Sequence, residues 1–337
     1  MNEFFNNFLY SFSFTLILIP IIVFFSHKLN LFDAPEFRKV HSEPTPRIGG
    51  LGIFTSFFAT VLMLNPLPMA KKYLFLALLS FFIGFSDDLK TITYRIRLLL
   101  MFLVSVLFLV IFRSPIISIG FALPFWFGCL FTVFCITGFV NAFNIIDGLN
   151  GLSSGIALIS TFSLFYISIS VGTDKTIPMM LFTLTGAISA FFLINFFTGK
   201  IFLGDGGSYF LGFIIVMFSI VLASSIQKIS PWFFIVINIY PVNEMLITVI
   251  RRIIKGKKPF KPDRMHFHHI LLKVTKSHKL STLLILIYST IIVSIAFPIF
   301  NNTRLLISLY ALSLFLHYII YRLLLRITIN FKNIAHG

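Results

Sequence analysis

Three short segments of the sequence hold acidic and amide side chains at spacings suited to a charged ligand. Asp87 and Asp88 are adjacent at the end of an apolar run. Acids at the C-terminus of a helix face the negative end of its dipole, so a divalent metal or a proton is expected to compensate for them. Asn141, Asn144 and Asp147 are three residues apart, which stacks them on one side of a continuing helix. Their oxygens suit Mg²⁺, a ribose or a base.

A third acid, Asp205, lies in a glycine-rich stretch just before another apolar run, and Asn195 precedes it. A glycine-rich turn at the N-terminus of a helix suits phosphate, and Ser208 is expected to cap that helix. Because a carboxylate repels phosphate, a metal ion is expected between the two. The alternative for each of these segments is a polar loop or turn with no ligand.

A basic loop carries Arg264 and three histidines, His266, His268 and His269. Three histidines so close together also suit zinc, but no cysteine is near them. Arginine forms forked hydrogen bonds to phosphate, and histidine donates to it as well. We therefore expect this loop to bind phosphate groups rather than zinc. The plainer alternative is an ordinary basic loop beside a membrane.

The composition requires that the chain fold in lipid. Of 337 residues, 58% are hydrophobic and 11% are charged, whereas soluble domains carry about 25% charged residues. The two cysteines, Cys129 and Cys135, lie in one apolar stretch and are interpreted as packing residues. The first seven residues contain Glu3 and no Lys or Arg, so the apolar run after them is read as a transmembrane helix and not as a cleaved signal.

Apolar segments of roughly 20 residues predict transmembrane helices. We expect an all-α polytopic membrane protein with about eleven such helices and a single domain, 1–337, without internal repeats. The expected spans lie near 8–25, 48–66, 72–86, 96–113, 121–140, 155–171, 177–197, 208–225, 231–250, 282–299 and 303–324.

The distribution of Lys and Arg predicts the orientation. With the N-terminus outside and the C-terminus in the cytoplasm, 21 of the 27 basic residues fall on the cytoplasmic side. Nearly all the acids also lie at that side, at helix ends. A proton- or ion-coupled transporter more often buries an acid near the midplane, so this pattern favours chemistry at the inner interface. The cytoplasmic catalytic loops are expected near 26–47, 87–95, 141–154, 198–208 and 251–281.

Taken in order, these motifs resemble the polyprenyl-phosphate N-acetylhexosamine-1-phosphate transferases, the family of the MraY, WecA and TagO enzymes. The resemblance runs from Asp33 to His269. It is closest to the WecA-like branch, because the histidine segment reads His266-Phe267-His268-His269 and because the segment 33–50 has the form of that branch.

The resemblance implies an enzyme of the inner cell membrane whose active site faces the cytoplasm. It would transfer a HexNAc-1-phosphate, by default GlcNAc-1-phosphate, from a UDP-sugar to undecaprenyl phosphate and release UMP, as the first membrane step of a cell-surface polysaccharide. It implies Mg²⁺ as cofactor, with Mn²⁺ as a substitute. The expected partners are the UDP-sugar, the polyprenyl phosphate, the membrane and, as an option, a second copy of the chain, but no nucleic acid. The alternatives are a transporter or lipid flippase and an inactive scaffold.

The resemblance also assigns roles to individual residues. It implies that Asp87, Asp88 and Asp205 are catalytic and that Asp205, with Asn144, binds the metal. It implies substrate binding by Asn141, Asp147, Asn150, Asn195, Arg264, His266, His268 and His269. Two positions depart from the pattern. Asn150 stands where many relatives have a second Asp, and Glu244 stands where several have Asp.

Overall fold

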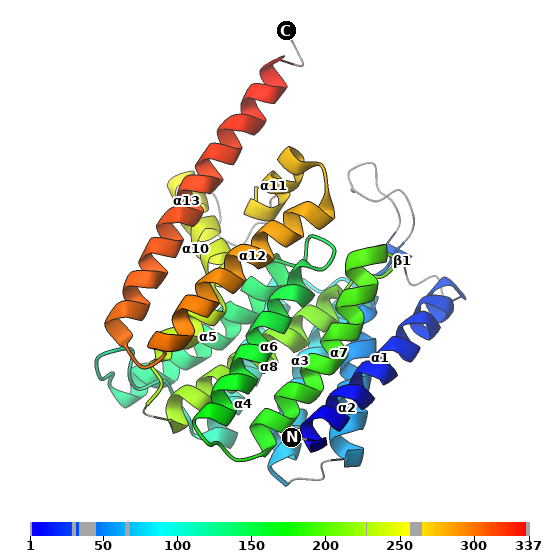
Figure 1. The fold of residues 1–337 in the computed structure, drawn as a ribbon, viewed down its shortest axis with the longest axis vertical. Coiled ribbons are helices and arrows are strands. Elements are labelled where there is room, and N and C mark those ends of the chain that lie inside the picture. The colour runs from blue at the N-terminus through cyan, green and yellow to red at the C-terminus, as the bar shows by residue number, and fades with distance from the viewer. Residues whose placement is uncertain are drawn as a thin grey trace.

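The computed structural model describes residues 2–28, 32–33, 45–64, 68–226, 228–256 and 265–334 as a bundle of helices (Figure 1). Arg264 and most of the segment 33–50 lie outside the described residues. The helices are α1 Asn2–Lys28, α2 Gly49–Leu64, α3 Pro68–Leu89, α4 Tyr94–Phe112, α5 Phe125–Ile145, α6 Leu152–Ser170, α7 Thr176–Thr198, α8 Gly204–Ser225, α9 Pro231–Ile237, α10 Ile239–Ile254, α11 Phe267–Thr275, α12 His278–Ala296, the 3₁₀ turn η1 Phe297–Ile299 and α13 Thr303–Ile334.

The expectation of a polytopic helical membrane protein is confirmed. Within the described residues, nine helices are long and apolar enough to cross a membrane. The expected spans near 48–66 and 231–250 are also helical, but α2 is shorter, and α9 and α10 form a pair bent by 85°. The number of eleven spans and the orientation therefore stay predictions. The third span is longer than expected, 22 residues in α3, because the helix includes the charged residues at both of its ends.

Helix α8 forms the centre of the bundle. All its residues from Gly206 to Leu222 are buried, as expected for a helix that is apolar on every side. It packs against α2, α3, α5 and α6. The contact with α3 is especially close at Gly84, where a Cβ atom would lie 2.1 Å from the carbonyl oxygen of Asp205. A glycine at this point lets the ends of the two acidic helices meet.

The bend between α9 and α10 has a local cause. Pro241 in the first turn of α10 has no N–H to continue the helical hydrogen bonds of α9. The side chain of Asn238, at the bend, donates to the carbonyl of Phe234 (2.9 Å) and accepts from the hydroxyl of Ser160 (2.8 Å). These two hydrogen bonds give partners to polar groups at the bend that a straight helix would not leave without partners. The bend turns α10 out of the line of α9, in the direction of α11.

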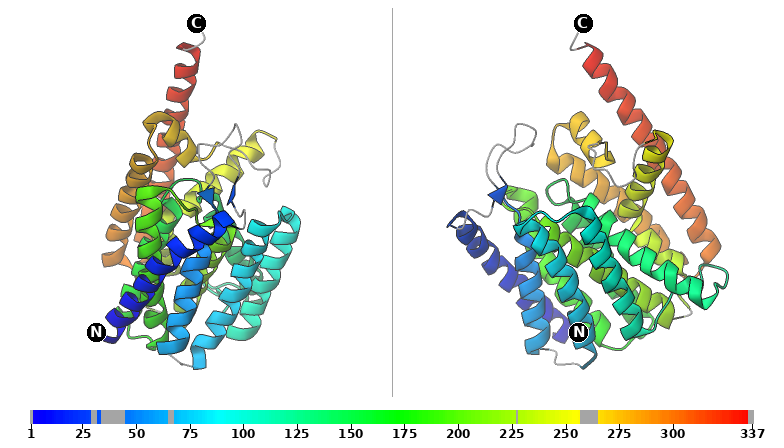
Figure 2. Two further views of the ribbon diagram at one scale, coloured as in Figure 1. Left: turned by 90° about the vertical axis from the view of Figure 1, so that its right-hand side faces the viewer. Right: turned by 180° about the vertical axis from the view of Figure 1, so that it is seen from behind.

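Three further features lie outside the predicted spans. Phe32–Asp33 (β1) and Thr45–Pro46 (β2) form a two-residue antiparallel pair beside the bundle. The loop 251–281, for which the sequence suggested no helix, contains α11. The last helix, α13, continues past the expected end at 324 and projects beyond the other helices (Figures 1 and 2).

Candidate active site

The residues singled out in the sequence gather at the end of the bundle away from the N-terminus, where β1 and α11 also lie (Figure 1). They come from the C-terminal ends of α3, α5 and α7, the turn 146–151, the first turn of α8 and the start of α11. Helix ends meet there because neighbouring helices in the bundle run in opposite directions. Arg264 is the one predicted site residue that lies outside the described residues.

The negative charge of Asp88 is compensated by the N-terminus of α8. Its two carboxylate oxygens accept hydrogen bonds from the backbone N–H groups of Asp205 and Gly206, both at 2.8 Å. The negative end of α3 thus meets the positive end of α8, which favours an ionised carboxylate. The N-terminal cap of α8 is therefore Asp88 and not Ser208, and the expectation for Ser208 was wrong because the helix begins earlier, at Gly204.

Arg97, near the start of α4, bridges two of the acids. Its Nη1 pairs closely with the Oδ2 of Asp87 and lies 3.5 Å from the Oδ2 of Asp205. Asp87 also accepts from the backbone N–H of Ile92 at 2.6 Å. In the sequence, Arg97 contributes only to the charge distribution that predicts the membrane orientation. The signal for its role in the site is an arginine placed inside an expected apolar span, where a charge is costly unless it has a partner.

Asn144 completes the acidic cluster, which we define as Asp87, Asp88, Arg97, Asn144 and Asp205. The amide nitrogen of Asn144 donates to the Oδ1 of Asp205 (2.5 Å) and to the hydroxyl of Ser208 (2.9 Å). The structure thus brings together the two residues predicted to bind metal.

Asn141 lies one turn earlier than Asn144 on α5. The three-residue spacing predicted a helix that continues through Asp147. Helix α5 does continue through Asn141 and Asn144, but it ends at Ile145, so Asp147 lies in the turn that follows and does not stack on the two asparagines. The side-chain amide of Asn141 donates to the carbonyl of Thr137 (2.7 Å) within the same helix. Its predicted role in substrate binding therefore stays a prediction.

A second group of predicted residues forms the turn 146–151 between α5 and α6. Asp147 accepts a hydrogen bond from the hydroxyl of Ser153 at 2.6 Å. Burial raises the pKa of Asp147 to about 6, although Ser153 and the nearby Arg47 act in the opposite direction. This carboxylate is therefore mostly ionised at neutral pH and gains a proton in mild acid.

Asn195 ties this turn to the loop before α8. Its Oδ1 accepts from the N–H of Gly151 (2.5 Å), and its Nδ2 donates to the carbonyl of Ile201 (2.6 Å). Asn150 is held in place by α12, because its backbone carbonyl accepts a hydrogen bond from the hydroxyl of Thr282 (2.9 Å). Both asparagines thus fix the shape of the turn, and their predicted contact with substrate stays a prediction.

The histidines pack directly on the same turn. A Cβ atom at Gly148 would lie 2.5 Å from the Nε2 of His268, so only glycine leaves room for this ring. The Nδ1 of His268 lies 3.2 Å from the hydroxyl of Tyr240. Burial lowers the pKa of His268 well below its usual value, so it is neutral at neutral pH. The rings of His266 and His269 lie 5.6 Å and 4.3 Å from it.

The charges of the acidic cluster fit a divalent cation. Three carboxylates face one guanidinium and the N-terminus of one helix, which supplies roughly half a positive charge. Among the described residues, no three side chains of His, Cys, Asp and Glu form a group that would hold a metal alone. A Mg²⁺ ion needs only one or two carboxylates when substrate phosphates and water supply its other ligands.

Comparison with known proteins identifies the family of the chain. The model of glycosyl transferase family 4 matches residues 71–223, a range that includes every residue of the acidic cluster. A probable undecaprenyl-phosphate N-acetylglucosaminyl 1-phosphate transferase of Bacillus subtilis is 31% identical over 279 residues, 80% of this chain and 77% of the relative. Undecaprenyl-phosphate alpha-N-acetylglucosaminyl 1-phosphate transferases are also similar: that of Salmonella typhi is 29% identical over 84% of this chain and 80% of its own, and that of Escherichia coli is 29% identical over 80% and 76%.

Proposed function

Since this chain belongs to glycosyl transferase family 4, we propose that it transfers an N-acetylhexosamine 1-phosphate from a UDP-sugar to undecaprenyl phosphate. In this reaction an oxygen of the lipid phosphate attacks the β-phosphorus of the UDP-sugar. The bond from that phosphorus to the oxygen it shares with UMP breaks, and UMP leaves. The names of the relatives favour N-acetylglucosamine as the sugar.

The observation that carries the proposal is the acidic cluster itself. Asp87 and Asp205 share Arg97, while Asp88 holds the first turn of α8 beside them. The residues of the cluster belong to four helices, α3, α4, α5 and α8, and lie at one end of the bundle, where a lipid phosphate and a water-soluble nucleotide can meet. A transporter has no need of three acids at a helix boundary, whereas transfer between two anionic substrates requires positive charge placed between them.

We assign the roles of the acids as follows. We assign to Asp87, which Arg97 and the N–H of Ile92 hold in place, the role of accepting a proton from the lipid phosphate. The side chains of Asp205 and Asn144 are in direct contact, the amide nitrogen of Asn144 donating to Asp205, and Asp88 orients Asp205 through its backbone N–H. A Mg²⁺ ion bound by Asp205 and Asn144 would neutralise charge on the diphosphate.

We assign the nucleotide to the second group. Asp147, the turn 146–151 and the histidines of α11 lie together, and the neutral His268 has its Nε2 directed at Gly148. In the part of the chain that the structure describes, this Nε2 has no hydrogen-bond partner. A buried polar atom without a partner is costly, which is consistent with a ligand group binding there.

We further propose that the protein lies in the inner cell membrane with this end of the bundle in the cytoplasm. UDP-sugars are cytoplasmic, and the sequence predicts that 21 of the 27 Lys and Arg residues lie on the cytoplasmic side. The product would begin a cell-surface polysaccharide.

The test is a reconstituted reaction. The purified protein in detergent, with undecaprenyl phosphate and Mg²⁺, is given a panel of UDP-N-acetylhexosamines, and released UMP is measured. We expect UMP with at least one donor and none when the lipid phosphate is omitted. A monodisperse protein that releases no UMP from any donor would contradict the proposal.

A further inference from the structure

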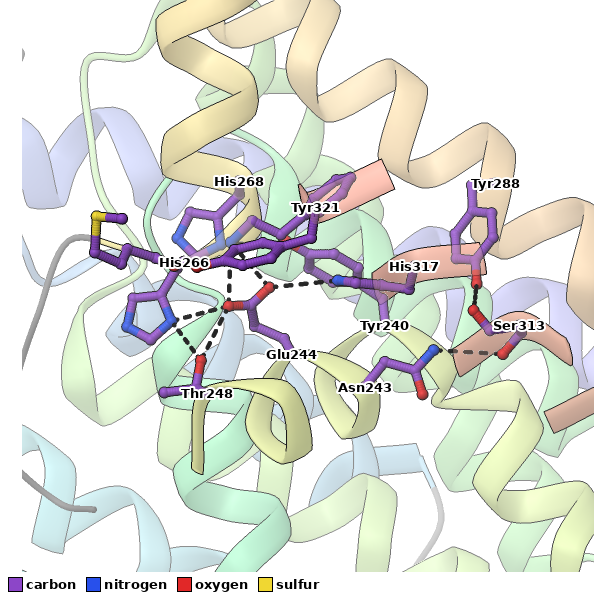
Figure 3. Close-up of polar contacts among 12 residues, drawn as sticks. Tyr240, Asn243, Glu244, Thr248, His266, His268, Tyr288, Ser313, His317 and Tyr321 are labelled. Atoms are coloured by element: carbon purple, nitrogen blue, oxygen red, sulfur yellow. Dashed lines mark hydrogen bonds and ion pairs between the residues drawn. The ribbon is translucent and has the colours of Figure 1, made fainter. Parts of the chain in front are cut away.

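A buried network outside the acidic cluster is centred on Glu244 of α10 (Figure 3). The side chain is only 2% exposed. Its Oε1 lies 2.9 Å from the Nδ1 of His266 and accepts from the hydroxyl of Thr248 at 3.3 Å. The backbone N–H of Phe267 donates to both carboxylate oxygens, at 3.2 and 3.1 Å. All of these contacts except that of Thr248 belong to the start of α11.

The position of Glu244 stabilises a buried carboxylate. A charge in a protein interior is costly unless hydrogen bonds satisfy it. Here the carboxylate caps the N-terminus of α11, where the helix dipole favours negative charge. His317 of α13 adds a second imidazole, its Nε2 3.8 Å from Oε2. An apolar residue in this space would leave the N–H of Phe267 and the Nδ1 of His266 without this acceptor, so the carboxylate does more than fill the space.

We propose that Glu244 is a positioning residue that sets the orientation and tautomer of His266 and thereby aligns the histidines for the substrate phosphates. A carboxylate at Nδ1 favours the form with hydrogen on that nitrogen, because the hydrogen bond made by one ring nitrogen determines the state of the other. The opposite nitrogen, Nε2, is then turned away from Glu244. This inference rests on the proposed function, because it assumes that the histidines bind substrate.

The same carboxylate sets the position of the other two histidines. Because it holds the first N–H of α11, it fixes where that helix begins. The ring of His268 stacks on that of His266 at an interplanar angle of 3°. Displacing the start of α11 would move His268 and His269 away from the turn at Gly148. One buried acid thus connects α10 to the nucleotide side of the site.

A neighbouring residue provides a matched control. Asn243, also buried, lies beside Glu244 on α10 and donates to the hydroxyl of Ser313 on α13 at 3.3 Å. In Figure 3 its side chain points toward Ser313 and away from the histidines. Asn243→Ala therefore weakens the packing of α10 on α13 without touching α11.

The experiment compares three variants of the full chain by UMP release and by thermal stability. In Glu244→Gln an NH2 group, which only donates, replaces one carboxylate oxygen, so the single remaining oxygen cannot serve both the Nδ1 of His266 and the N–H of Phe267 as the carboxylate does. We expect kcat to fall by about tenfold to a hundredfold, the usual effect of losing a residue that orients an imidazole, with KM for the UDP-sugar within a factor of about three. Glu244→Asp keeps the carboxylate and should recover most of the lost turnover. Asn243→Ala should lose stability and keep its turnover per folded molecule.

A second measurement does not depend on activity. The ring-nitrogen chemical shifts of His266, assigned with His266→Gln in histidine-labelled protein, report which nitrogen carries the hydrogen. We expect the Nδ1–H form in the wild type and a change in Glu244→Gln. If Glu244→Gln keeps more than about a third of wild-type kcat with unchanged His266 shifts, the proposal is wrong. It is also wrong if all three variants lose only stability. Failure of the proposed function is distinguishable, because the wild type itself would then release no UMP.

Discussion

Replacing Asp205 with Asn tests the acidic cluster most directly. The substitution keeps the shape of the side chain and removes one negative charge. In the structure Asp205 Oδ1 accepts from the amide of Asn144 at 2.5 Å, and Oδ2 lies 3.5 Å from Arg97. The backbone N–H that Asp88 caps is unchanged by the substitution. The helix should therefore form as before, while the charge that faces the substrate falls.

The structure gives two magnitudes that separate stability from catalysis. At an effective dielectric constant of about 20, two unit charges at the Asp205–Arg97 distance of 3.5 Å interact by about 5 kcal/mol. Their side chains are 31% and 23% exposed, so solvent screening reduces the net contribution to stability to about 0–1 kcal/mol. The effect on turnover follows from charge. Three carboxylates and one guanidinium have a net formal charge of −2, and Asp205→Asn reduces it to −1, half of its value. We expect kcat to fall at least about a hundredfold, or about 2.7 kcal/mol on the barrier.

The assay is UMP release by the purified, monodisperse variant at saturating Mg²⁺. The matched control is Asp174→Asn, the same chemical change in the loop between α6 and α7 at the other end of those helices. Asp174 caps the N–H of Thr176 (2.9 Å), so its variant should lose some stability and keep its turnover. If Asp205→Asn retained more than about a tenth of wild-type turnover, the reasoning about this cluster would be refuted.

Four further predictions follow from the same geometry. Excess chelator should abolish UMP release and added Mg²⁺ or Mn²⁺ should restore it, because the cluster keeps uncompensated negative charge; full turnover in chelator would contradict this. Asp88→Asn should lower both turnover and thermal stability, the latter by about 1 kcal/mol, because Asp88 caps α8 at two N–H groups; unchanged melting would argue against the cap. Gly84→Ala should lose activity and stability, because its Cβ would lie 2.1 Å from a backbone oxygen, whereas Gly138→Ala, whose nearest neighbour is 4.0 Å away, should be tolerated in both assays. A cysteine in place of Lys279 should react with an impermeant thiol reagent only after the membrane is permeabilised, because the loop 251–281 is predicted to be cytoplasmic; labelling in intact cells would reverse the orientation.

Local sequence patterns predicted the helices well and their interruptions poorly. Long apolar runs such as 208–225 identify a helix because backbone groups in lipid must bond within the segment. The same rule does not indicate the 85° bend between α9 and α10, where Pro241 interrupts the helical hydrogen bonds and Asn238 accepts from Ser160 of a distant helix. Similarly, α8 begins at Gly204 and not near 208, because the carboxylate of Asp88 is available to cap it.

The sequence by itself determined that the chain is a helical membrane protein, which acids end its helices, and which family it resembles. These conclusions depend on composition, on the spacing of side chains within one segment and on motifs in a fixed order. Only the tertiary structure decided which groups compensate the acids. The sequence predicted a metal or a proton for Asp87 and Asp88, whereas the structure gives Arg97 to one and the N-terminus of α8 to the other. It likewise gave Glu244 its partner His266, 22 residues along the chain. Such pairs depend on how closely distant helices pack, and the periodicity of one segment holds no information on its neighbours.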